Sequence, residues 1–145
     1  MLQFERSSKR WWQKPLVIVD GKHIPAELAV LFANLEAQEM GAWLNSRGTK
    51  SATVGFAGSR SGEFKTLRAP LPDFVAVQLQ GLYRESTLGK GAPDLVVWRE
   101  ADRSVRFIEV KNPHWDCPSP EQIQFLAAAQ ARGISTAIVE WEFRS

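Results

Sequence analysis

Several features are scarce in this chain of 145 residues. The single cysteine, Cys117, excludes an intramolecular disulfide and a cysteine-rich zinc site, and it suits a reducing compartment. Neither His23 nor His114 stands at ligand spacing to a second histidine or cysteine, so a zinc site is not expected. No apolar run approaches the length of a membrane span, and no apolar core follows the charged N-terminus as it would in a secretory signal. We therefore expect a soluble, cytoplasmic protein with no membrane partner.

Net charge is also small, because 18 basic and 16 acidic residues leave a balance of +2. Such a balance permits nucleic-acid binding without arguing for it, so the distribution of charge is the more informative property. The hydrophobic share of 44% is typical of a globular protein, and the length suits one domain with a buried core. We expect residues 1–15 to be a basic, aromatic N-terminal arm and residues 16–145 to be a single domain. The tryptophans of the arm would dock on the core; the alternative is an arm that contacts nucleic acid.

Two strand-like segments, residues 94–98 and 107–111, are apolar and rich in β-branched residues, and residues 100–103 between them read as a hairpin turn. Side chains alternate along a strand, so Phe107, Glu109 and Lys111 share one face. Folding the hairpin brings the carboxylate of Asp94 towards Glu109 and Lys111. Burying these charges costs several kcal/mol per ion unless something compensates them, and a divalent metal ion would do so.

The motif formed by these residues is similar to a known one. Pro93-Asp94, a gap of fourteen residues and Glu109-Val110-Lys111 resemble the signature of the PD-(D/E)XK nuclease superfamily. Residues 119–133 resemble the helix that follows the lysine in the VRR-NUC (virus-type replication-repair nuclease) family, through Ser119-Pro120-Glu121-Gln122, Phe125-Leu126, Ala129 and Gly133. The resemblance covers residues 90 to about 141. It implies an α/β fold of the restriction-endonuclease-like class, with a central mixed sheet flanked by helices.

The same resemblance implies a Mg²⁺ or Mn²⁺ ion bound by Asp94, Glu109 and the main-chain carbonyl of Val110. Such an ion polarises water and phosphate oxygens, and it prefers oxygen ligands. A glutamate near the start of the first helix adds a carboxylate in this family, and Glu27 matches it by its place, fourteen residues before Gly41 at the expected helix end. The alternative is that Glu27 is only a favourable acid facing the helix dipole.

Lys111 and Gln122 complete the candidate catalytic residues. We expect the metal and partial burial to lower the pKa of Lys111, which would orient or deprotonate the attacking water or stabilise the phosphorane. Gln122 matches the glutamine of the family, although a capping box with Ser119 already explains it. The alternatives for the motif residues are a turn aspartate at Asp94 and a surface ion pair between Glu109 and Lys111.

The remaining pattern predicts the elements around this motif. A strand is expected at residues 16–19 with a turn at Asp20-Gly21, and a helix from Pro25 to about Asn45. Residues 71–85 allow a strand or a helix, and the family order favours the strand. A helix that begins after Ser119 should end at Arg132 before Gly133, and residues 136–141 should form the last strand.

Residues 48–70 are rich in glycine, serine, threonine and basic side chains, as a segment that contacts a phosphodiester backbone would be. The alternative is a solvated hairpin. The candidate DNA-binding residues are Arg47, Lys50, Arg60, Lys65, Arg68 and Lys90.

Taken together, these features predict a metal-dependent DNA endonuclease that is selective for junctions or flaps in replication or repair. A restriction or defence nuclease of the same fold, a catalytically silent nucleic-acid-binding module and a protein–protein adaptor are the alternatives. The resemblance also implies a homodimer as one arrangement, in which paired sites cut two strands.

The sequence departs from the family at Asn112-Pro113, where glycine-proline is usual, and the loop to Ser119 is about one residue longer, with Trp115 and Cys117 in it. Loops near the metal decide which DNA structure fits.

Overall fold

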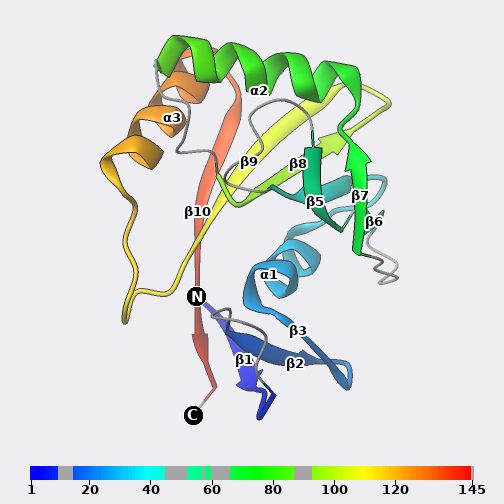
Figure 1. Ribbon diagram of the computed structural model, residues 1–145, viewed down its shortest axis with the longest axis vertical. Coiled ribbons are helices and arrows are strands. Elements are labelled where there is room, and N and C mark those ends of the chain that lie inside the picture. Colours follow the sequence, from blue (N-terminus) through cyan, green and yellow to red (C-terminus); the bar gives the residue numbers. More distant parts are fainter. Residues whose placement is uncertain (10–14, 45–51, 57, 60–65, 87–92, 145) are drawn as a thin grey trace.

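The computed structural model of the protein describes residues 1–9, 15–44, 52–56, 58–59, 66–86 and 93–144 (Figure 1). Its described strands form an eight-stranded sheet in the order β3-β2-β1-β10-β9-β8-β4-β6 and a separate ribbon of β5 and β7. The strands are β1 (Leu2–Arg6), β2 (Leu16–Val19), β3 (Lys22–Pro25), β4 (Met40–Trp43), β5 (Ala52–Phe56), β6 (Gly58–Ser59), β7 (Thr66–Pro70), β8 (Leu95–Arg99), β9 (Ser104–Lys111) and β10 (Ser135–Phe143). The helices are α1 (Ala26–Asn34), α2 (Asp73–Ser86) and α3 (Pro120–Ala131).

Helices cover both faces of the large sheet. One core joins α1 to Leu95, Val97 and Ile108, whereas the other joins α2 and α3 to Val96 and Phe107. In Figure 1, α2 and α3 lie next to each other and α1 lies apart from them. Alternate residues of β8 and β9 therefore enter opposite cores, as expected for strands buried on both faces. The predicted α/β class, a mixed sheet flanked by helices, is confirmed.

The predicted hairpin is also confirmed. Strands β8 and β9 are antiparallel, with Leu95 opposite Ile108 and Val96 opposite Phe107. The turn between them contains Arg103 at a positive φ of 55°. After β9, the chain crosses through α3 and returns as β10, which is parallel to β9. A parallel neighbour requires such a crossover, and the helix in it is the element that reaches the end of β9.

The first helix is shorter than predicted, because α1 ends at Asn34 and Met40–Trp43 forms β4, antiparallel to β8. Pairing with β8 satisfies the backbone of β4, and the guanidinium of Arg106 donates to the carbonyl of Asn34 at the end of the helix. A Cβ on Gly41 would come within 2.6 Å of Leu31 Cδ1, so glycine allows β4 to lie close against α1. Gly41 is thus a strand residue and not the predicted helix end.

The strand favoured for residues 71–85 is wrong, because Asp73–Ser86 is helix α2. Val75, Leu79, Leu82 and Tyr83 are all buried, and they recur at the spacing of one helical face. Their side chains pack against α3 and the sheet. Family order misled the assignment where the 3.6-residue period was the better signal.

Residues 2–6 of the expected arm are part of the sheet and are not a loose segment. Strand β1 pairs in parallel with β10, where Leu2 lies opposite Trp141, and in antiparallel with β2. The predicted strand β2 and its turn are confirmed, with Asp20 and Gly21 at φ of 51° and 76°. The tryptophans of the expected arm, at positions 11 and 12, lie outside the described residues.

The C-terminal elements agree with prediction. Helix α3 begins after Ser119, whose side chain accepts from the N–H of Gln122 in a capping box, and Gly133 follows the helix at a φ of 75°. The last strand is slightly longer than expected, at Ser135–Phe143. No described helix has the length and apolar character needed to cross a membrane.

Candidate active site

Asp94 and Glu109 meet at the end of the β8–β9 hairpin. The register that places Leu95 opposite Ile108 brings the preceding Asp94 alongside Glu109. Asp94 Oδ2 accepts a hydrogen bond of 2.8 Å from the N–H of Val110, and Glu109 is fully buried. Burial and the charge of Glu109 raise the pKa of Asp94 to about 8. Burial also raises the pKa of Glu109, although hydrogen bonds from Asp94 and Lys111 oppose it. Two acids thus lie together where both resist ionisation.

The two oxygens of Glu109 differ in their surroundings. Oε1 accepts from Lys111 Nζ at 3.0 Å and from Gln122 Nε2 at 2.8 Å. Oε2 is buried and has no hydrogen-bond partner in the described part of the chain. A buried carboxylate oxygen without a donor is costly, and a hard divalent cation is a suitable partner for it. The chemistry of this donor set, with a second carboxylate alongside, therefore fits Mg²⁺ or Mn²⁺.

Lys111 lies between two acids. Its side chain is 8% exposed, and Nζ is 3.0 Å from Glu109 Oε1 and 3.4 Å from Asp116 Oδ2. Burial lowers the pKa of Lys111, but the hydrogen bond and charge of Glu109 and the charge of Asp116 outweigh burial, so the pKa is raised. The lowered pKa predicted from the sequence depended on the charge of a bound metal ion as well as on burial, and it stays a prediction for the metal-bound site. Asp116 was not predicted as a site residue from the sequence. Its position five residues after the motif lysine is the feature that could have indicated a contact with Lys111.

Gln122 has a second role that the capping box concealed. Its Oε1 accepts from the N–H of Ser119 at 2.8 Å, and its Nε2 donates to Glu109. One amide thus fixes the start of α3 and contacts the buried acid of β9. The box holds the side chain in the orientation that this contact requires.

Glu27 lies in the first turn of α1 and accepts a hydrogen bond from the indole N–H of Trp43. Its charge contributes to the raised pKa of Glu109, so the two acids are electrostatically coupled. Among the described residues, however, no group of three or more histidine, cysteine, aspartate or glutamate side chains is arranged to hold a metal ion. The structure brings together Asp94 and Glu109, and Glu27 as a third carboxylate of the site stays a prediction.

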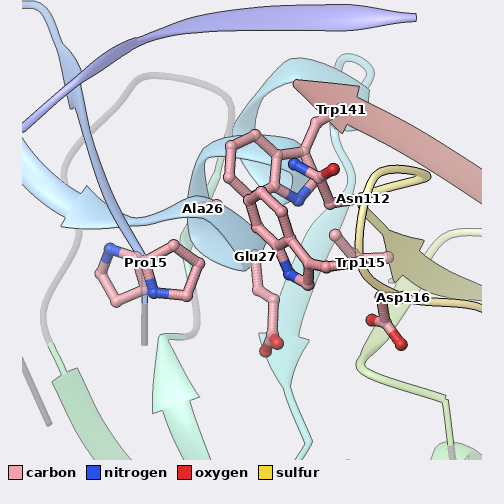
Figure 2. A pocket seen from close by; sticks show the side chains of 9 residues that line it. Pro15, Ala26, Glu27, Asn112, Trp115, Asp116 and Trp141 are labelled. Carbon is pink, nitrogen blue, oxygen red and sulfur yellow. The ribbon is translucent and has the colours of Figure 1, made fainter. Parts of the chain in front are cut away.

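A pocket of about 150 Å³ adjoins this centre (Figure 2). It lies between the start of α1, the segment after β9 and the end of β10, and it is lined by Pro15, Pro25, Ala26, Glu27, Val110, Asn112, Trp115, Asp116 and Trp141. Of these, Glu27 and Val110 were candidate site residues from the sequence. Trp115 was noted there only as part of an unusually long loop, and Trp141 only as the end of a strand.

The candidate DNA-binding residues are mostly not described. Arg47, Lys50, Arg60, Lys65 and Lys90 lie outside the described residues. Arg68 lies in β7, opposite Val54 of β5. The antiparallel pairing of β5 with β7 is compatible with both predictions for this segment, a DNA contact and a solvated hairpin.

Comparisons with known proteins bear on the same part of the chain. Residues 78–141 match the model of the VRR-NUC domain. No curated protein matches the chain. Two solved structures are similar, paFAN1 bound to 2nt 5′ flap DNA with gap and paFAN1 bound to 1nt 5′ flap DNA with gap. Identity is 24% to each, over 48% and 52% of this chain, with TM-scores of 0.41 and 0.40. The match spans only 14% of either paFAN1 chain.

The matched residues contain the described centre. Asp94, Glu109, Lys111 and Gln122 all fall within residues 78–141, as do α3 and the crossover to β10. The mixed sheet with helices on both faces is consistent with the restriction-endonuclease-like class that the motif implied. Residues 78–141 are therefore similar to the VRR-NUC domain, the family that the Pro-Asp and Glu-Val-Lys motif predicted.

Proposed function

We propose that this protein is a nuclease that uses a divalent metal ion to hydrolyse phosphodiester bonds in DNA. The VRR-NUC match supports a nuclease acting on DNA. The observation that carries the metal-dependent chemistry is the convergence of Asp94, Glu109 and Lys111, with Glu109 Oε2 buried and unpartnered among the described residues. Such clustering of perturbed, buried ionisable groups is typical of functional sites.

Asp94, Glu109 and the main-chain carbonyl of Val110 would hold Mg²⁺ or Mn²⁺, with Glu27 as a further carboxylate nearby. When bound, the ion would polarise water and phosphate oxygens and offset the charge of the two acids. The raised pKa of Asp94 and the unpartnered oxygen of Glu109 both support this donor set. Gln122 holds Glu109 by a hydrogen bond and so orients one of the two acids.

Lys111 supplies positive charge beside these acids. Its ammonium is paired with Glu109 and Asp116, which favour the charged form. In that form it donates to a phosphate oxygen and stabilises the negative charge that develops there. Of the roles predicted for this lysine, stabilisation of the phosphorane agrees best with its surroundings, because a paired ammonium does not accept a proton from water.

Selectivity for flaps or junctions is part of the proposal, and it rests on the family resemblance. Arg68 and the five undescribed basic residues remain the proposed contacts to the DNA backbone. A homodimer also remains a prediction, and the molecular mass in solution with and without DNA tests it.

The test uses the purified chain with linear, flapped and four-way-junction DNA of the same sequence, with Mg²⁺, Mn²⁺ or chelator. We expect cleavage only with metal, and we expect Asp94→Asn and Lys111→Met each to slow it by about a hundredfold or more. Asp20→Asn is the matched control, because Asp20 lies in an exposed turn that is distant in sequence from Asp94 and Lys111, and asparagine tolerates its positive φ.

Three results would contradict the proposal or narrow it. Cleavage by Asp94→Asn at the wild-type rate would exclude this centre as the active site. Metal-independent DNA binding without cleavage of any substrate would favour the silent binding module. Cleavage of linear duplex at one sequence, with no preference for branched DNA, would favour the restriction or defence nuclease.

A further inference from the structure

The pocket beside the proposed metal centre has a mixed lining, most of which the proposed phosphodiester chemistry does not use. It shares Glu27 and Val110 with that centre, so any group held in it lies next to the proposed metal site. Figure 2 shows Pro15 on one side of the pocket and Trp115 with Asp116 on the other. Its volume of about 150 Å³ is smaller than the several hundred Å³ of a drug-sized ligand site, and this suits a single ring system.

Aromatic side chains form one wall of this pocket. Trp115 is 58% exposed, although it is a large apolar residue. Its ring meets Trp141 in a T-shaped contact at 5.7 Å and lies 6.1 Å from Phe143. These contacts hold the indole in place while much of its surface stays accessible. An exposed and fixed indole is a platform on which a nucleobase can stack.

A buried amide supplies a donor. Asn112 is 2% exposed and lines the pocket, and its Oδ1 accepts from the N–H of His114 at 3.0 Å. That contact assigns the oxygen, so the other atom of the amide is the NH₂ group. This Nδ2 is buried and has no hydrogen-bond partner in the described part of the chain. A buried donor without an acceptor is costly, and a carbonyl group of a ligand would satisfy it.

Acidic side chains complete the lining. Glu27 and Asp116 supply carboxylates at this pocket, and Figure 2 shows both side chains below the two tryptophans. Two carboxylates repel a phosphate, whereas they accept hydrogen bonds from ring N–H or exocyclic amino groups. The pocket thus offers an aromatic wall, one hydrogen-bond donor for a carbonyl group and two carboxylate acceptors. This combination suits a neutral, flat ring that carries both a carbonyl and N–H groups.

We propose that this pocket binds one unpaired, carbonyl-bearing nucleobase of the DNA (thymine, cytosine or guanine) beside the scissile phosphate. This inference rests on the proposed nuclease function and adds a substrate class to it. The base stacks on Trp115 and accepts from Asn112 Nδ2, while its sugar and phosphates stay outside the pocket. A paired base cannot enter, so the pocket makes an unpaired nucleotide a feature that the protein recognises.

The test compares binding of three single-stranded probes of equal length by the full chain in chelator: oligothymidylate, oligodeoxyadenylate and an abasic backbone. Because a base can stack on Trp115, we expect the thymine probe to bind about tenfold or more tightly than the abasic probe. The affinity of the adenine probe should lie between these two, because adenine has no carbonyl to accept from Asn112. Trp115→Ala should bring the thymine-to-abasic ratio close to one, and Trp115→Phe should keep most of it. Ile123→Ala, an equally exposed apolar truncation on α3, should leave the ratio unchanged.

Asn112→Asp tests the donor, because it keeps the oxygen that His114 requires and removes the NH₂ group. We expect it to weaken every probe through its charge and also to abolish the preference for thymine over adenine. A direct contact is measured with 5-iodouracil in the probe, whose photocrosslink should map to residues 112–118 or to Trp141. Circular dichroism of each variant shows that it is folded.

The outcomes separate this inference from the nuclease proposal. If Trp115→Ala retains the thymine-to-abasic ratio, or if the crosslink maps away from these residues, the nucleobase pocket is wrong. The nuclease proposal then still stands, provided that Asp94→Asn abolishes cleavage. A wild-type protein that binds all three probes equally, or none of them, also overturns the pocket.

Discussion

Gln122 offers the sharpest test of how the fold supports the candidate active site. Its side chain takes part in the capping box of α3 and donates to Glu109 Oε1 at 2.8 Å. Replacing it with methionine, which has a similar length and no donor, removes both interactions. Ser119→Ala removes the cap from the other side and leaves the amide of Gln122 in reach of Glu109. The pair separates helix capping from the support of the buried acid.

The magnitudes follow from the two interactions. Loss of the Ser119 N-cap costs about 1 kcal/mol of stability. Gln122→Met keeps that cap but loses the hydrogen bond from the Ser119 N–H, so it should be destabilised by about the same amount. A hydrogen bond to a charged group contributes about 1.5–3 kcal/mol, and partners of metal ligands typically affect affinity or activity by about 10–100-fold. We therefore expect Gln122→Met to lower kcat/KM by about 10–100-fold, whereas Ser119→Ala stays within about threefold of wild type.

Two assays measure these effects. Urea unfolding gives the stability of each variant, and cleavage of a labelled DNA substrate over a Mn²⁺ titration gives kcat/KM and the apparent metal affinity. If Gln122→Met cleaves DNA as fast as Ser119→Ala at equal stability, then the contact with Glu109 has no part in the site and Gln122 is only a cap.

Three further predictions concern stability. The pKa of Glu39 is lowered from 4.5, because hydrogen bonds from Arg106 and from a backbone N–H outweigh the effect of burial. Its contribution to stability is thus present above pH 4.5 and is lost as the pH falls through the lower folded-state pKa, so Glu39→Gln should cost about 1–3 kcal/mol in urea unfolding at neutral pH and progressively less in acid. Gly41→Ala should cost about 1–3 kcal/mol, because the new Cβ would meet Leu31 Cδ1 at 2.6 Å, and Leu31→Val in the same chain should relieve part of that cost; additive losses in the double variant would contradict the steric reason. Phe125 is fully buried and makes a T-shaped contact with Phe107, and Phe125→Ala should lower the free energy of unfolding by about 3–5 kcal/mol; a loss below about 1 kcal/mol would mean that α3 does not depend on this contact.

The sequence was sufficient where the signal was local. The hairpin of β8 and β9, the turn at Asp20-Gly21 and the capped start of α3 depend on residues close together in the chain, and all three are confirmed. Period-two alternation also placed Asp94 alongside Glu109 and Lys111 correctly, because the register of a hairpin follows from its turn. The motif also predicted the family whose model matches residues 78–141.

Tertiary structure decided the rest, since each remaining feature depends on a partner far along the chain. Residues 40–43 read as helix by themselves and become β4 because β8 pairs with them and Arg106 closes the end of α1. Residues 2–6 read as an arm and become β1 because β10 and β2 lie on either side. Pairing of Lys111 with Asp116 and of Gln122 with Glu109 likewise needs the crossover to fold back. Local sequence encodes dihedral preferences and the alternation of faces, whereas contacts between distant segments set which strand pairs, which charge is buried and which pKa is shifted.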